Sequence, residues 1–498
     1  MSAPAIAPAP DPTLLAAALG DLREDFDELL FLCRSGEAEL AEAAADIAGA
    51  DLHPGTRELL LGQLSSSRLR HRSTARRLVS LRDPGRRAAV AAPALLEELA
   101  GEKASLADLL RTERALTAAL VGAADWQSPS FLHSTVPAAG RQDGRIREGW
   151  NDYKRDRHLD ADAHERRYRE AMVDGPPGLR ALLTSCGMAA FTTILGFLAM
   201  EGRLAGPVLA GAGLYHESRL LLERAVPGRL HVVDEGDPAA LGRAIDGLRP
   251  SAVFLDTLSN TRWMPVPDLP PVMARLGDAY LVLDNTGLSA SFQPFALADA
   301  VRLIVFESLL KYAQLGLDRA NAGVIVARAE DAEALSGYRE HLGTNVADVA
   351  VHALPRPDRR VLERRLARIQ RNALILSRRL TERAPPSVAV VYPGLPSHRC
   401  AGAARALRFR GGFLSLVFRE GGARLRRERA LVERAVAEAR RRGVPLVAGA
   451  GFGFDTTRVY VAATRPGAGE PFVRVAAGTE HRLQVEAVAG ALASVLAG

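Results

Sequence analysis

The sequence predicts an α/β protein with a mostly parallel central sheet, an all-helical N-terminal extension and a small C-terminal α+β domain. Three observations favour this fold class. Apolar residues recur at helical spacing early in the chain, short apolar runs alternate with helical stretches in the middle, and further strand-like runs follow a long helix. A chain of 498 residues is long enough for two to four domains, each with its own core.

In the N-terminal extension, the leucines from Leu14 to Leu30 follow a helical period. Further helices are expected at residues 54–81, where Pro54 suits a first turn, and at residues 93–121. Prolines and glycines then interrupt the pattern. We divide the chain into a helical extension, a linker or arm, a large α/β domain and a small α+β domain, at residues 1–125, 126–150, 151–385 and 386–498.

The large domain contains short, apolar, β-rich runs that are separated by helical stretches, which is the pattern of a parallel sheet buried on both faces. The predicted strands are residues 182–185, 208–212, 230–233, 252–255, 280–283, 303–306 and 323–327. The predicted helices between them are residues 189–200, 215–225 and 238–248. A long helix at 357–383 leads to strands at 388–392, 413–418 and 458–462 around a helix at 426–442.

The composition excludes several classes of protein. With 48% apolar and 24% charged residues, the chain is not globally disordered, and it holds no uncharged apolar run of about 18 residues that could span a membrane. The net charge of +6 comes without the basic, aromatic-rich block that favours nucleic-acid binding. Three scattered cysteines predict neither a disulfide framework nor a metal site. We therefore expect a cytoplasmic protein without metal, membrane or nucleic-acid partners.

Lysine is almost absent from the chain. Of 64 basic residues, only Lys103, Lys154 and Lys311 are lysines, which leaves 61 arginines. A lysine that persists against this bias is a candidate for amine chemistry, because a guanidinium stays protonated and forms no Schiff base.

Polar residues at the ends of predicted strands are candidate site residues, because ligands of open α/β sheets bind beyond the carboxyl ends of the strands. Asp284 could bind a metal, a ribose or a cationic ring nitrogen, or simply cap a turn. Lys311 could attack a carbonyl carbon or form an interdomain ion pair. The turn Cys186-Gly187-Met188 precedes a helix, so it could bind phosphate or be an ordinary turn.

Other cofactor motifs are weak. Gly211-Ala212-Gly213 lacks the third glycine of a dinucleotide loop, since His216 stands there, and the glycine-rich run at residues 449–453 comes too late in the chain for a Rossmann start. The sequence contains no phosphate-loop lysine motif, zinc-binding His-Glu-x-x-His helix or nucleophile elbow.

Taken in order, these segments resemble the fold-type I pyridoxal-phosphate enzymes of cysteine and methionine metabolism, the relatives of cystathionine γ-synthase, cystathionine γ-lyase and methionine γ-lyase. The resemblance runs from about residue 152 to the C-terminus. It is carried by Tyr153-Lys154-Arg155, Cys186-Gly187-Met188-Ala189-Ala190, Tyr215, Asp256-Thr257-Leu258-Ser259-Asn260, Asp284-Asn285-Thr286, Ser308, Lys311-Tyr312 and residues 392–398, 411–415 and 473–480.

The resemblance implies that pyridoxal phosphate is the cofactor. It implies that Lys311 carries the cofactor as an internal aldimine and acts as general base, with quinonoid intermediates in the reaction, and that Tyr215 stacks on the ring and helps to protonate the leaving group. Asp284 would pair with the ring nitrogen, and Asn260 would lie near the phenolic oxygen. The remaining cofactor-binding residues would be Cys186, Gly187, Met188, Thr286 and Ser308.

The resemblance also implies a homodimer or homotetramer with an active site shared across the interface. Tyr153 and Arg155 would reach the phosphate of the neighbouring subunit, and Tyr153 would also face the substrate. Arg474 would bind the α-carboxylate of an amino-acid substrate through a bidentate pair.

The expected activity is γ-elimination or γ-replacement on a γ-substituted L-amino acid with a thiol, acyloxy or halide leaving group. Leu310 stands where the family usually has threonine, and Thr261 where it has proline, which indicates a divergent member in specialised metabolism. The alternatives are β-elimination, another fold-type I reaction such as that of a cysteine desulfurase or aminotransferase, and a catalytically silent interaction protein.

Overall fold

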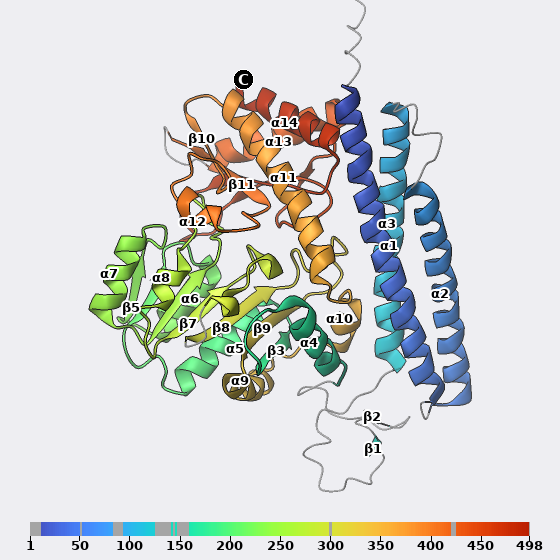
Figure 1. The fold of residues 1–498 in the computed structure, drawn as a ribbon, viewed down its shortest axis with the longest axis horizontal. Helices are drawn as coiled ribbons and strands as arrows, with labels where there is room; N and C mark the ends of the chain where they lie inside the picture. The colour runs from blue at the N-terminus through green and yellow to red at the C-terminus, as the bar shows by residue number, and fades with distance from the viewer. Residues whose placement is uncertain are drawn as a thin grey trace, which may run out of the picture.

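The computed structural model describes residues 11–49, 52–82, 93–124, 141–142, 145–146, 159–297, 301–419 and 425–497. These residues form a bundle of long helices, a seven-stranded sheet flanked by helices and a five-stranded sheet with its own helices (Figure 1). The predicted fold class is confirmed. Within the described ranges, no helix combines the length and the hydropathy needed to cross a membrane. The division of the chain into domains stays a prediction.

The N-terminal bundle consists of α1 (Pro12–Gly49), α2 (Pro54–Arg82) and α3 (Pro93–Ala124). Each helix begins with a proline, whose fixed φ suits a first turn. Phe26 and Leu22 of α1 are almost fully buried, so the apolar stripe that predicted this helix is its packing face. Figure 1 shows the three helices side by side along one flank of the molecule, next to α10 (Asp348–Ala353) and α11 (Arg359–Arg383).

The seven-stranded sheet is parallel except at one strand. Its order is β3 (Leu179–Thr184), β9 (Gly323–Arg328), β8 (Arg302–Ser308), β7 (Tyr280–Asp284), β6 (Ala252–Asp256), β4 (Val208–Gly211), β5 (Leu230–Val233). Only β9 runs opposite to its neighbours. The carboxyl ends of the other strands therefore meet at one edge, where the segments that follow β3, β6, β7 and β8 come together.

Helices cover both faces of this sheet. They are α4 (Leu159–Met172), α5 (Gly187–Met200), α6 (His216–Ala225), α7 (Pro238–Leu248), α8 (Leu269–Met273) and α9 (Ala329–His341), with short 3₁₀ turns at Ser289–Ser291 and Pro294–Ala296. The apolar helix α5 packs on the sheet through Phe191, whose ring contacts Phe254 and Phe306 at centroid distances of 6.1 and 5.8 Å. This packing fixes the start of α5 at the carboxyl edge.

The C-terminal sheet has the order β10 (Val388–Val391), β11 (Phe413–Phe418), β14 (Phe472–Ala476), β13 (Arg458–Ala462), β12 (Val447–Ala448). Its helices are α12 (Ala401–Arg405), α13 (Leu425–Arg441) and α14 (Arg482–Ala497). Two further strands, β1 (Arg141–Gln142) and β2 (Arg145–Ile146), form a separate pair. The strands β12 and β14 were not predicted as such, because β12 is very short and a buried arginine interrupts the apolar run of β14.

Candidate active site

A cavity of about 850 Å³ lies at the carboxyl edge of the large sheet and is closed on the other side by the C-terminal sheet. Arg474 lies behind its wall, in contact with residues that line it. Tyr153, Lys154 and Arg155 fall outside the described residues. The sequence-predicted residues that line the cavity are Cys186, Gly187, Met188, Tyr215, Asn260, Asp284, Thr286, Ser308 and Lys311.

The turn after β3 places the start of α5 at one corner of the cavity. Cys186 caps this helix, with its Sγ accepting from the backbone N–H of Ala189 at 3.3 Å. A Cβ at Gly187 would lie 2.7 Å from the Cβ of Ser308, so only glycine lets these segments approach. The result is a narrow corner that combines helix N–H groups with the Ser308 hydroxyl, which suits a phosphate.

Asp284, at the end of β7, and Lys311, in the loop after β8, line the same cavity. The first four residues of β7 are buried and Asp284 is its one partly exposed residue. Burial raises the pKa of the Asp284 carboxyl, and hydrogen bonds from Thr286 and the charge of Lys311 oppose this rise. Thr286 donates its N–H to Asp284 Oδ1 at 2.9 Å, and its Oγ1 accepts from Ser308 N at 2.9 Å, so it ties the two strand ends together.

Burial lowers the pKa of the Lys311 amine, while the carboxylates of Asp318 and Asp284 act in the opposite direction. Its Nζ lies 5.4 Å from the centroid of the Phe452 ring. An amine that is buried and has a lowered pKa is neutral more often at neutral pH, and the neutral form is the nucleophile.

A second carboxylate, Asp256, also ends a strand and lines the cavity, although the sequence analysis gave it no role beyond its place in a motif. It is 4% exposed, and its Oδ1 has no hydrogen-bond partner. Burial and the charges of Asp284 and Glu235 raise the pKa of Asp256 well above its usual range. The strand-end argument that selected Asp284 applies to Asp256 as well, and could have found it.

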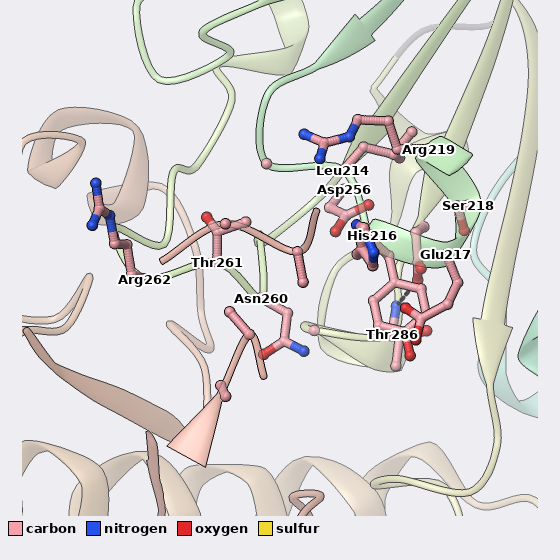
Figure 2. Close-up of a pocket in the computed structure, with 18 of the residues that line it drawn as sticks. Leu214, His216, Glu217, Ser218, Arg219, Asp256, Asn260, Thr261, Arg262 and Thr286 are labelled. Carbon is pink, nitrogen blue, oxygen red and sulfur yellow. Dashed lines mark hydrogen bonds between the residues drawn. The ribbon is translucent and has the colours of Figure 1, made fainter. Parts of the chain in front are cut away.

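Figure 2 shows Asp256, His216 and Thr286 gathered on one side of the cavity and Arg262 on the opposite side, with Asn260 between them. Tyr215 precedes the first residue of α6, and 36% of its surface is exposed, so its ring is free to stack on a bound planar group. Burial and the nearby Glu217 raise the pKa of Tyr215 to about 12, so the phenol keeps its proton at neutral pH.

Arg474 lies on the face of the C-terminal sheet that is turned to the cavity. Its cross-strand neighbours are Ser415 and Tyr460, and Tyr460 lines the cavity. Arg474 Nη2 donates to the Asn260 carbonyl at 2.8 Å, while Nε and Nη1 have no acceptor and Ser415 Oγ has no partner. Within the described part of the chain, no carboxylate pairs with Arg474, and burial lowers its pKa to about 10.

The rest of the wall comes from two loops that the sequence did not connect with the site. The glycine-rich run at residues 449–453, rejected above as a dinucleotide loop, brings Phe452 over Lys311. Three contacts hold the loop after β13 to α6 and to the loop that follows β6. They are Arg465–Glu217 at 2.7 Å, Arg219 to the Gly467 carbonyl at 3.2 Å and Arg262–Glu470. Only long-range packing reveals these residues.

The cavity fits pyridoxal phosphate. The corner at Gly187 and Ser308 suits its phosphate, and the lysine amine suits its aldehyde. The neighbouring carboxyls of Asp256 and Asp284 both have a raised pKa, and Asp256 Oδ1 has no hydrogen-bond partner, so a protonated ring nitrogen beside them would favour their charged forms. The fold and the cavity therefore define a fold-type I pyridoxal-phosphate enzyme.

Comparison with known proteins gives the family. The profile described as "Cys/Met metabolism PLP-dependent enzyme" matches residues 112–436, which is well over half of the chain, and the chain belongs to this family. Pyridoxal phosphate is accordingly its cofactor. The match begins near the end of the bundle, so most of the bundle lies outside it.

Two curated relatives differ in length from this chain. The bifunctional enzyme flvA of Aspergillus flavus is 29% identical over 329 residues, which cover 63% of this chain and 39% of flvA. The chain thus spans well under half of that relative. A probable cystathionine gamma-synthase of Herpetosiphon aurantiacus is 28% identical over 254 residues, which cover 48% of this chain and 74% of the relative.

Solved structures share the fold. Cystathionine gamma synthase from Xanthomonas oryzae pv. oryzae has a TM-score of 0.58 at 23% identity, covering 72% of this chain and 90% of that one. A methionine gamma lyase from Micromonospora echinospora has a TM-score of 0.55 at 25% identity, covering 70% of this chain and 89% of that one.

Proposed function

We propose that this enzyme catalyses γ-elimination or γ-replacement on a γ-substituted L-amino acid, in specialised metabolism. The observation that carries the proposal is the presence of Lys311 and Asp284 in one cavity with the unpaired guanidinium of Arg474 behind its wall. A relative named as a probable γ-synthase and a solved γ-lyase support the reaction type. The departures at Thr261 and Leu310 support a specialised substrate.

Pyridoxal phosphate, when bound, supplies an electron sink for bonds at the substrate α-carbon. Lys311 would hold the cofactor through its side-chain nitrogen and then take the proton from the α-carbon, and its lowered pKa suits both tasks. Asp284 would keep the proton on the ring nitrogen, and Asn260 would lie at the phenolic oxygen. The phosphate would be held by Cys186, Gly187, Met188, Thr286 and Ser308.

Arg474 would bind the substrate α-carboxylate through its unpaired Nη1 and Nε, and so orient the bond that breaks. Tyr215 would stack on the cofactor ring. Because the phenol of Tyr215 keeps its proton at neutral pH, it is suited to donate that proton to the leaving group.

We expect the γ-substituent of the intact substrate to carry no charge. The wall formed by the C-terminal sheet and its loops carries the apolar residues Phe413, Ala450, Phe452, Val461, Ala462, Ala463 and Phe472. The arginines at the rim are already paired, as Arg262–Glu470, Arg399–Asp234 and Arg465–Glu217. A charged substituent would lose its hydration there without gaining a free partner, whereas a thiol, acyloxy or halide group would not.

We also infer a homodimer or homotetramer in which Tyr153 and Arg155 reach the phosphate of the neighbouring subunit, and in which Tyr153 faces the substrate. A cytoplasmic location is supported by the three cysteines within the described residues, Cys33, Cys186 and Cys400, which are all free thiols.

The test is a screen of the purified enzyme with matched γ- and β-substituted amino acids. γ-Elimination releases ammonia and 2-oxobutanoate, whereas β-elimination releases ammonia and pyruvate, so the keto acid identifies the bond that breaks. γ-Replacement is detected with an added thiol as the coupled amino-acid product. If pyruvate is the only keto acid released, the enzyme catalyses β-elimination and our proposal is wrong. If the enzyme turns over only substrates with charged substituents, the apolar subsite is contradicted.

A further inference from the structure

The N-terminal bundle is attached to the rest of the molecule through partly buried charges. On α11, Arg371 pairs with Asp21 of α1 at 2.5 Å, and Arg368 pairs with Asp25 at 3.1 Å. From α3, Lys103 pairs with Asp25 at 2.8 Å and donates to Thr479 Oγ1 at 3.1 Å. Buried ionic contacts require fixed geometry, so they hold the bundle in one position on the enzyme.

The same network reaches two loops beside the cavity. Arg111 of α3 donates from Nε to the carbonyl of Gly316 at 2.9 Å and forms an ion pair with Asp455. Asp455 also pairs with Arg365 at 2.8 Å, and Arg365 donates to the Gly453 carbonyl at 2.9 Å. A guanidinium from the bundle thus links the loop that follows Lys311 with the loop between β12 and β13.

These two loops are in direct contact with Lys311. A Cβ at Gly453 would lie 2.7 Å from the carbonyl oxygen of Lys311, so the two backbones touch there. The neighbouring Phe452 places its ring 5.4 Å from Lys311 Nζ. At Gly316, a Cβ would lie 2.6 Å from Asp455 Oδ1, which shows equally close packing between the loops. A shift of either loop would move the backbone or the apolar cover of Lys311.

The charge of Asp455 depends on its cationic neighbours. Burial alone would raise the pKa of Asp455, but the charges of Arg365, Lys103 and Arg111 outweigh burial and lower this pKa to about 2. Loss of Arg111 would leave the Gly316 carbonyl without this donor and weaken the hold on Asp455. Arg111 lies directly before the region that matches the family profile, residues 112–436.

We propose that Arg111 is a positioning residue, through which the bundle sets the placement of Lys311 and Phe452 in the cavity. This inference rests on the proposed function, in which Lys311 holds the cofactor. The bundle would then support catalysis from outside the cavity, with no contact of its own to cofactor or substrate.

The experiment compares the holoenzyme with two variants. Arg111→Ala removes the link to both loops. Arg77→Ala is the matched control, because Arg77 pairs with Glu102 between α2 and α3 and the contacts of that pair lie within the bundle. Each protein is examined for thermal unfolding, for the pH midpoint of the cofactor absorbance and for kcat and KM.

For Arg111→Ala we expect bound cofactor and cooperative unfolding close to that of Arg77→Ala. We also expect a pH midpoint displaced by about half a unit or more and a kcat lower by about 10- to 100-fold at little change in KM. If Arg111→Ala does not fold, Arg111→Lys replaces it, since lysine keeps the charge but cannot bridge both acceptors with a planar fork.

A pH midpoint and kcat that match those of Arg77→Ala would overturn the positioning role. Failure of the proposed function is seen separately, because the wild-type protein would then show no cofactor absorbance that depends on Lys311.

Discussion

Arg474→Met tests how the enzyme recognises its substrate. Methionine keeps the packing against the rings of Phe413 and Phe472 but removes the charge. Burial lowers the pKa of Arg474 from 12.5 to about 10, so the folded protein disfavours the charged guanidinium by about 3 kcal/mol. A substrate carboxylate supplies the missing counter-charge and recovers this free energy. Removal of the Arg474 charge is therefore expected to weaken substrate binding by about 300-fold.

The assay follows the cofactor absorbance while an amino acid or its methyl ester is titrated into the holoenzyme. The wild-type protein should bind the acid about two orders of magnitude more tightly than the ester, and Arg474→Met should bind both equally weakly. Arg379→Met is the control, since it removes a guanidinium that pairs with Glu486 on the surface. An acid-to-ester preference that survives in Arg474→Met would refute the assignment of Arg474.

Three further predictions concern other residues of the sheet and cavity. Asp284→Asn should retain bound cofactor but lose about 100-fold or more in kcat, measured by keto-acid release, because the ring nitrogen loses its anionic partner; an unchanged kcat would contradict this role. Tyr215→Phe should slow substrates with poor leaving groups more than those with good ones, which a leaving-group series would show; a uniform effect would leave only the stacking role. Burial raises the pKa of Glu307 from 4.5 to about 8, so its contribution to stability falls as pH rises between these values. The free energy of unfolding of Glu307→Gln, measured by thermal unfolding, should therefore exceed that of the wild type by more at pH 9 than at pH 6. The upper bound of this stabilisation at pH 9 is about 5 kcal/mol, and an equal effect at both pH values would contradict the raised pKa.

The large sheet was predictable from the sequence because its strands are short apolar runs; the central ones are buried, and the edge strand β5 is partly exposed. Residues 230–233 and 238–248 were predicted with the bounds that β5 and α7 have. Asp284 and Lys311 were then predicted as site residues because they follow predicted strands, and parallel strands bring their carboxyl ends to one edge of the sheet. The ordered motifs added Tyr215 and Asn260, which periodicity alone does not select.

Other parts of the site depend on contacts between distant segments. Phe452 reaches Lys311 from a loop about 140 residues away in sequence, and no local pattern marks it. The bundle contacts are hidden for a different reason. Among 61 arginines, nothing in the sequence distinguishes Arg111 or Arg365 from residues on the surface. Only the folded chain shows that the side chain of Arg365 is 1% exposed and pairs with Glu28 of α1 at 2.5 Å.

The most direct test of the central claim is the absorbance spectrum of the purified protein after addition of pyridoxal phosphate, with wild type beside Lys311→Ala. We predict a band near the edge of the visible range that is present in the wild type, is removed by borohydride and is absent from Lys311→Ala. Peptide mapping of the reduced wild type should find the cofactor on Lys311. A wild type without this band, or a band that persists unchanged in Lys311→Ala, would contradict the assignment of Lys311 and with it the proposed reaction.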